Sequence, residues 1–161
     1  MSLLLERYSA AMTPAERLQT LAEGRQPAMI ARMSSGFAVM GDTQFLPGYS
    51  LLLAYPMVEQ LTDLPRAGRL AFLGDMATLG EAVKRATGCR RVNFSIYGNL
   101  DPFLHAHVWP RYAHEDPAYR TLPPFLYPPA LRDDPLVAFR VSAHGPLQER
   151  IAAELKRLAR A

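Results

Sequence analysis

Apolar and polar residues alternate along this chain in two rhythms, which predict strands and helices in a mixed order. A period of two, or a short apolar run bounded by turn residues, is typical of a strand. A return of apolar residues about every 3.6 positions is typical of a helix. Six strands are predicted on the first criterion: Met29–Met33, Phe37–Met40, Tyr49–Tyr55, Arg91–Tyr97, Phe103–Trp109 and Leu136–Ser142.

Three helices are predicted on the second criterion. The longest runs from Pro65 to Thr87, and Gly88 is its expected stop. A short helix begins at Thr13-Pro14-Ala15-Glu16, where Thr13 and Glu16 can form a capping box. The last helix, Leu147–Ala161, is amphipathic. The apolar face of the longest helix is expected to carry Leu70, Leu73, Met76, Ala77, Leu79 and Val83.

The strands at 91–97 and 103–109 are separated by a short loop and are expected to pair antiparallel. Their apolar rows must then share one face, because a slip of one residue would put one row in water. The opposite face would gather polar and aromatic side chains: Asn93, Ser95, Tyr97, His105, His107 and Trp109. Such a face is a reasonable binding surface.

Two further segments complete the expected domain. Tyr49–Tyr55 is almost entirely apolar, which predicts burial on both faces of its strand. Six prolines lie between 113 and 135 together with Tyr119, Phe125 and Tyr127, so an ordered wrap over the surface is expected there. A length of 161 residues allows one domain, and no internal repeat is present.

Charge and cysteine content narrow the class of protein. The formal net charge is only +3, and no basic run exceeds Arg90-Arg91, which disfavours nucleic-acid binding. The single Cys89 excludes an internal disulfide and fits a reducing, cytoplasmic compartment. No apolar run approaches the roughly 20 residues that span a bilayer, so no membrane association is expected.

His105 and His107 are the strongest candidates for chemistry, because alternation places both imidazoles on one face. A neutral imidazole can attack phosphorus and carry a phosphoryl or nucleotidyl group transiently. His107, Ser95, Asn99 and backbone N–H groups of the Gly98 loop are candidate donors to the phosphate oxygens.

Two other interpretations of the histidine pair stay open. Both rings can simply pack in the sheet, as Trp109 and Phe103 can. They can also ligate a metal, with His114, His144, Asp101 or Glu115 as further ligands, although none of these has a diagnostic spacing.

The segment 98–111, GNLDPFLHAHVWPR, resembles the signature of the histidine triad (HIT) superfamily, in which three alternating histidines precede two apolar residues. The earlier segment 42–64, with QFLPGYSLLL at its centre, is similar to another part of that family. The resemblance covers about Met29–Tyr112. It implies an α+β fold with a roughly five-stranded antiparallel sheet and a long helix packed on it. We therefore expect a single HIT-like domain over 1–161, with a core of about 27–112 and a Pro-rich wrap and C-terminal helix over 113–161.

The resemblance also implies roles for individual residues. The middle histidine of the triad, the family's nucleophile, falls on His105, and the last, which contacts phosphate, falls on His107. The phosphate-contacting amide falls on Asn99, with Asn93 and Ser95 as further polar candidates. The ribose-binding position falls on Gly41 or Asp42, and Trp109 is the candidate for contact with the base. In the family, a backbone carbonyl at the first triad position holds the nucleophile's second nitrogen.

Two positions depart from the family pattern. Phe103 occupies the first triad position, and Tyr49 replaces a histidine that often follows the Pro-Gly pair. Phe103 offers the carbonyl but no side-chain hydrogen bond, and general acid–base help is worth about 10²–10⁴-fold in rate.

The function implied is hydrolysis or transfer at the α-phosphate of a dinucleoside polyphosphate or nucleoside phosphoramidate, through a nucleotidyl-histidine. The alternative is a nucleotide-binding protein whose catalysis is weakened by Phe103 and Tyr49. A nucleotide is the expected small-molecule partner, a homodimer is expected, and no cofactor or metal is required.

Overall fold

Five antiparallel strands form one sheet in a computed structural model that describes residues 12–160. Their spatial order is β1-β2-β3-β5-β4. The strands are β1 (Met29–Met33), β2 (Gly36–Met40), β3 (Ser50–Ala54), β4 (Arg91–Ile96) and β5 (His105–Arg111). The helices are α2 (Pro14–Ala22), α3 (Arg66–Thr87), α4 (Pro129–Arg132) and α5 (Val141–Leu158), with 3₁₀ turns η1 (Leu61–Asp63), η2 (Pro124–Leu126) and η3 (Pro135–Val137). The predicted α+β class, five-stranded sheet, long helix and C-terminal helix are confirmed.

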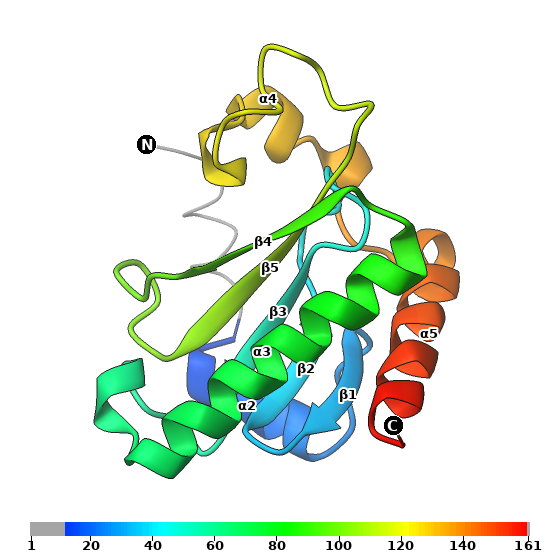
Figure 1. Cartoon of the computed structure of the whole chain (residues 1–161). Coiled ribbons are helices and arrows are strands. Elements are labelled where there is room, and N and C mark those ends of the chain that lie inside the picture. Colours follow the sequence, from blue (N-terminus) through cyan, green and yellow to red (C-terminus); the bar gives the residue numbers. More distant parts are fainter. Residues whose placement is uncertain (1–11, 161) are drawn as a thin grey trace.

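One face of the sheet packs on α3 and α5 (Figure 1). Leu52 and Ala106 point to this side and meet Phe72 of α3 and Ile151 of α5, all fully buried. The predicted partnership of the two apolar rows is confirmed, because Phe94 lies opposite Val108 and Ile96 opposite Ala106. All five residues of β3 are buried, as its apolar composition predicts.

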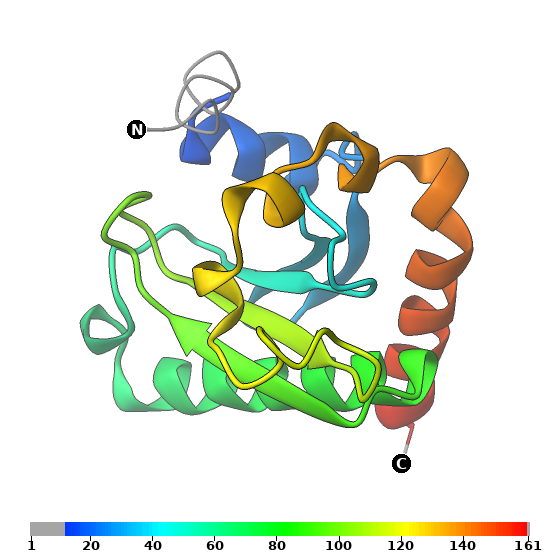
Figure 2. The ribbon, with the colours of Figure 1, turned by 90° about the horizontal axis from the view of Figure 1, so that it is seen from above.

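The other face of the sheet is covered in part by α2, which lies across the sheet from α3 (Figure 2). Leu18 and Leu21 of this helix are buried against the strand residues of that face. The predicted capping box is present, with the Thr13 hydroxyl accepting from the Glu16 N–H and the Glu16 carboxylate accepting from the Thr13 N–H. The first helix therefore covers the face that carries the histidines.

Helix α3 ends as expected at Gly88, whose φ of 66° is left-handed. Its buried stripe differs from the expected one. Leu79 and Val83 are buried, but Leu70 and Leu73 are 56% and 37% exposed, and Phe72 faces the core instead. The helix is rotated about its axis relative to the expected orientation. Phe72 therefore faces the core, and Gly80 lies directly against the Phe94 ring of β4.

The strand predicted at Leu136–Ser142 is wrong. Pro135 opens the turn η3, the Asp134 carboxylate accepts from the Leu136 N–H, and only one isolated bridge, Thr43 with Ala138, pairs as in a sheet. The last helix begins six residues earlier than predicted, at Val141, and continues through Pro146. The ring of His144 accepts from the Arg140 N–H and so satisfies a donor at this early start. The helix ends at Leu158, three residues before the predicted end at Ala161, which itself lies outside the described residues.

Helix α5 packs beside the outer edge of β1. The side-chain amide of Gln148 donates to the backbone carbonyls of Pro27 and Met29, at 2.9 and 2.7 Å. At the other end of the sheet, the segment between β5 and α5 arches over the ends of β4 and β5 and carries η2 and α4 (Figure 1).

Candidate functional site

His105 begins β5 and lies on the face opposite α3. Its strand neighbour is Leu53, whose side chain belongs to the cluster on that face. The Nδ1 atom of His105 lies 2.8 Å from the backbone carbonyl oxygen of Phe103. Because a carbonyl only accepts, the ring donates through Nδ1–H. The lone pair is then on Nε2, which has no hydrogen-bond partner among the described residues.

His107 follows on the same face, with its ring centroid 5.0 Å from that of His105. Its Nδ1 atom lies 2.7 Å from the hydroxyl of Tyr49. Tyr49 is the residue just before β3. Strand β3 pairs with β5 so that Leu51 lies opposite His107, which brings Tyr49 close to the His107 ring. Tyr49, where the resemblance to the histidine triad signature implies a histidine, is therefore a direct partner of the second imidazole.

Tyr49 and Trp109 form an aromatic stack beside His107. Their ring centroids are 3.7 Å apart and the planes differ by 2°. His107 continues the stack, 5.4 Å from Trp109 and 9° from its plane. A Cβ on Gly41 would lie 2.2 Å from the Tyr49 ring, so only glycine allows this ring position. Both Tyr49 and Trp109 are 6% exposed, and the stack is a wall of the site.

Ser95 and Asn93, on β4, are tied to other side chains. The Ser95 hydroxyl accepts from the Trp109 indole N–H at 3.1 Å. The Asn93 side-chain oxygen accepts from Arg111 at 3.0 Å. Ser95 thus lies at the histidine pair, opposite His107 in the sheet, while Asn93 lies toward the far end of β5.

The other predicted site residues lie at the margin. Asn99 is exposed in the loop between β4 and β5. Asp42 is exposed and forms an ion pair with Arg17 of α2 at 3.1 Å. The positive charge of Arg17 also acts on His105. A cation near the first imidazole is a feature that the sequence analysis missed, because no motif connects a residue of the first helix with the triad.

Burial sets the charge state of both imidazoles. Burial lowers the pKa of His105. The hydrogen bond to the Phe103 carbonyl and the charge of the Asp101 carboxylate raise this pKa, but burial is the larger effect. Burial, together with the neighbouring His105, lowers the pKa of His107 to about 4. Both rings are therefore neutral near pH 7, as a nucleophile and a tautomer-specific donor require.

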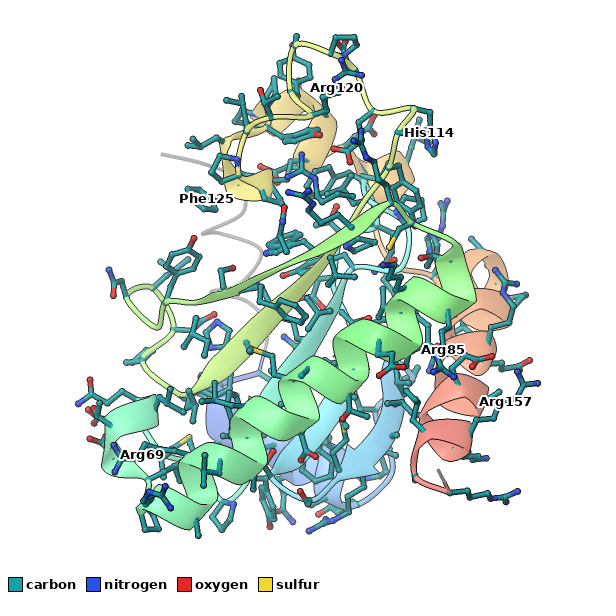
Figure 3. All side chains as sticks on the ribbon, in the orientation of Figure 1. Arg69, Arg85, His114, Arg120, Phe125 and Arg157 are labelled. Carbon is teal, nitrogen blue, oxygen red and sulfur yellow. The ribbon has the colours of Figure 1, made fainter. Side chains whose placement is uncertain are left out.

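The wrap reaches the site through aromatic contacts. Phe125 of η2 meets Tyr97 edge to face at 5.4 Å between centroids, and Tyr97 lies 6.0 Å from His107 (Figure 3 labels Phe125). Among residues 12–160, no three His, Cys, Asp or Glu side chains gather at metal-binding distance. Two surface cavities lie elsewhere, one of about 370 Å³ beside Asp42 and one of about 430 Å³ around Arg111.

Solved structures with the same arrangement of sheet and helices are histidine triad proteins. One from Sinorhizobium meliloti matches with a TM-score of 0.66 over 78% of this chain and 87% of its own, at 18% identity. The chain has the histidine triad fold. A hypothetical histidine triad nucleotide-binding protein from Sulfolobus tokodaii, at 12% identity, matches this fold with a TM-score of 0.67, over 89% of this chain and 93% of its own.

A zinc-bound histidine triad family protein from Mycobacterium smegmatis has the same fold. It shares 20% identity with this chain and matches with a TM-score of 0.58, over 86% of this chain and 94% of its own. No protein-family model and no curated protein matches the sequence. Within the described part of the chain, the helices are too short or too polar to cross a membrane.

Proposed function

We propose that this histidine triad fold carries a nucleotide hydrolase or nucleotidyl transferase, with His105 attacking the α-phosphate of its substrate. The observation that carries the proposal is the 2.8 Å hydrogen bond from His105 Nδ1 to the Phe103 carbonyl. It keeps the Nε2 lone pair available on a ring whose pKa is lowered by burial. An imidazole held in this way is an oriented nucleophile.

His107 supplies the complementary group. We assign the Tyr49 hydroxyl as the donor in its 2.7 Å contact with His107 Nδ1, which places the remaining ring proton on Nε2. A neutral His107 then presents an N–H to a non-bridging phosphate oxygen, where negative charge builds up in the transition state. Donors of this kind are worth about 3–4 kcal/mol when removed from other active sites.

The reaction proceeds in two displacements. Nε2 of His105 forms a bond to the α-phosphorus while the bond to the leaving group breaks, and the leaving group keeps the electron pair. Water then attacks the nucleotidyl-histidine, releases a nucleoside monophosphate and returns the imidazole; an alcohol or phosphate in place of water completes a transfer.

The leaving group is where Phe103 matters. A polyphosphate leaves as a stable anion without a proton, whereas the amine of a phosphoramidate must be protonated as it leaves. Phe103 has no proton to give. We therefore favour a dinucleoside polyphosphate over a nucleoside phosphoramidate as the substrate class.

Trapping the intermediate tests the proposal. A radiolabelled dinucleoside polyphosphate, quenched in alkali at early times, is expected to label the protein with a base-stable, acid-labile adduct. His105→Ala should lose both the adduct and turnover, while His114→Ala, a change at an exposed histidine outside the pair, should keep them. Turnover retained by His105→Ala without an adduct would rule out the mechanism.

Exchange of the first triad residue tests the leaving-group argument. Phe103→His is expected to raise the rate on a phosphoramidate by about 10²-fold or more, and to change the rate on a dinucleoside polyphosphate much less. The ratio of the two kcat/KM values measures this preference. An equal rise on both substrates would contradict it.

A nucleotide-binding protein with little catalysis is the second candidate. The favouring observations are that His105 is only 9% exposed and that the Phe103 ring lies 4.8 Å from its ring. Calorimetry showing micromolar binding of AMP, with no turnover of any adenylated compound, would select this function. The expected homodimer, the cytoplasmic location and the single-domain organisation stay predictions.

A further inference from the structure

The far end of β5 carries a basic cavity separate from the histidine pair. Its volume is about 430 Å³, which is in the range of small-ligand sites. It lies between the start of β4, the end of β5 and the first part of the wrap. The residues that line it are Arg90, Arg91, Asn93, Arg111, Tyr112, Ala113, Glu115, Arg120 and Thr121.

The residues that line this cavity carry a positive formal charge. Four of them are arginines and one is a glutamate, a formal sum of +3. The remaining 14 basic and 14 acidic residues of the chain balance one another. The lining of the cavity is therefore basic and suited to an anion.

Arg111 fixes the wall of the cavity and is not itself available to a ligand. Its guanidinium donates to both carboxylate oxygens of Glu115 and to the side-chain oxygen of Asn93. It also donates to the backbone carbonyls of Arg120 and Leu122, at 2.9 and 2.8 Å. These bonds hold the segment around Arg120 and Leu122 against the end of β5 and so fix the position of the cavity wall.

The remaining three arginines are available. Arg90, Arg91 and Arg120 are exposed, and none of them has a carboxylate within 4.0 Å among residues 12–160. Asn93 adds a donor, because its oxygen is used by Arg111 and its amide nitrogen is not. Guanidinium groups match phosphate oxygens in geometry and charge. Ala113 and the Tyr112 ring are the main apolar surfaces of the cavity.

We infer that this cavity is an anion site for an oligophosphate group, held by Arg90, Arg91 and Arg120. Arg111 lies six residues after His105 on the same strand, about 20 Å away at the usual rise. The buried Trp109 stands between them. The site is thus distinct from the histidine pair and does not depend on the nucleotide chemistry proposed there.

Titration of the full chain with tripolyphosphate tests this inference. Calorimetry measures the binding, because the fluorescence of Trp109, the chain's one tryptophan, would also respond to a phosphate at His107, whose ring centroid lies 5.4 Å from that of Trp109. The triple variant Arg90→Gln, Arg91→Gln, Arg120→Gln is expected to bind about tenfold more weakly or worse. ATP should compete through its phosphates, and adenosine should not.

A matched variant separates a site from general attraction. Arg66→Gln, Arg69→Gln, Arg150→Gln removes the same charge from exposed positions, and Arg69 lies at the opposite end of the molecule from Arg120 (Figure 3). It should weaken binding less than twofold, and His105→Ala should not change it. Equal weakening by both triple variants, loss of binding in His105→Ala, or no binding by the wild type would overturn the inference.

Discussion

At the scale of single residues, Tyr49 is a tyrosine where the resemblance to the histidine triad signature implies a histidine. A histidine at this position would place a second titrating ring beside His107. The Tyr49 hydroxyl contacts Nδ1 of His107 at 2.7 Å. In the proposed mechanism, this one hydroxyl decides which nitrogen of His107 carries the proton.

Removal of that hydroxyl is the direct test. Tyr49→Phe keeps the ring that stacks on Trp109 but frees His107 to adopt either tautomer, so kcat should fall about tenfold with little change in KM. Nitrogen-15 NMR of labelled histidine should show the His107 ring leaving a single tautomer. Tyr97→Phe, which removes a hydroxyl from the other tyrosine near His107, should leave the spectrum as it is.

Acid should destabilise the protein through the same ring. The pKa of His107 is about 4 in the folded protein against an ordinary value of 6.5. Between these values the unfolded chain binds a proton that the folded one does not, so stability is lost as pH falls from about 6.5 to 4. Urea unfolding should show a loss of up to about 3 kcal/mol.

The control variants make this assignment specific. His107→Gln should flatten the pH dependence of the free energy of unfolding over that range. His114→Gln, at an exposed position, should leave the slope as in the wild type. A steep slope that survives in His107→Gln would assign the acid sensitivity to other groups, His105 first among them.

The sequence predicted which face of its strand each site residue occupies, but it did not predict the hydrogen-bond partners of these residues. Alternation alone puts His105 and His107 on one side of β5, because side chains in a strand have a period of two. The contact of His107 with Tyr49 joins residues 58 positions apart and depends on the register of β3 against β5. Asn93 and Ser95 were expected near phosphate, and their present partners, Arg111 and Trp109, follow from the same register.

At the scale of elements, α3 packs so closely on β4 that two of its glycines should respond in opposite ways to alanine. A Cβ on Gly80 would lie 2.3 Å from the Phe94 ring, whereas a Cβ on Gly74 meets nothing within 4 Å. Gly80→Ala should cost about 1–3 kcal/mol of unfolding free energy. Gly74→Ala should add up to about 1 kcal/mol, because alanine restricts the unfolded chain.

Denaturant unfolding of the two variants measures both effects under one set of conditions. Similar small changes at both positions would mean that the ring of Phe94 moves aside at little cost. The pair was not predictable from periodicity, which placed Leu70 and Leu73 on the buried face. Helical periodicity gives the width of an apolar stripe, but the bulky residues at 72 and 94 decide which edge of it meets the sheet.

The wrong strand at 136–142 has a related cause. A short apolar run was present, but Pro135 and the capping carboxylate of Asp134 favour a turn, and His144 satisfies the helix start at Arg140. Local side-chain bonds to the backbone outweighed the preference of the apolar run for a strand. The long helix and four of the five sheet strands were predicted within one residue at each end, because apolar periodicity and stop signals agreed there. The histidine strand begins and ends two residues later than predicted.

At the scale of the whole molecule, the ion pair of Arg111 and Glu115 fastens the wrap to the sheet. Their side chains are only 10% and 5% exposed. Arg111→Met would leave a buried carboxylate without its partner, so the free energy of unfolding should fall by about 3–5 kcal/mol. Hydrogen exchange should rise in the part of the wrap over 113–127.

An exposed ion pair gives the comparison. Arg157 and Glu154 on α5 are 73% and 16% exposed, and Arg157→Met should cost less than about 1 kcal/mol. The double variant Arg111→Met, Glu115→Leu should recover part of the loss of Arg111→Met, because no unpaired charge stays buried. Equal losses for Arg111→Met and Arg157→Met would show that the wrap is held by its other contacts.

The bonds from Gln148 to Pro27 and Met29 have a consequence for behaviour in concentrated solution. Unpaired carbonyl groups along an exposed edge strand can accept hydrogen bonds from strands of other molecules, and such pairing leads to aggregation. A single amide reaching back from the last helix occupies two such groups at the β1 border. These two carbonyl groups are therefore not available to a strand of another molecule, and Gln148→Ala is expected to raise the tendency of the concentrated protein to aggregate.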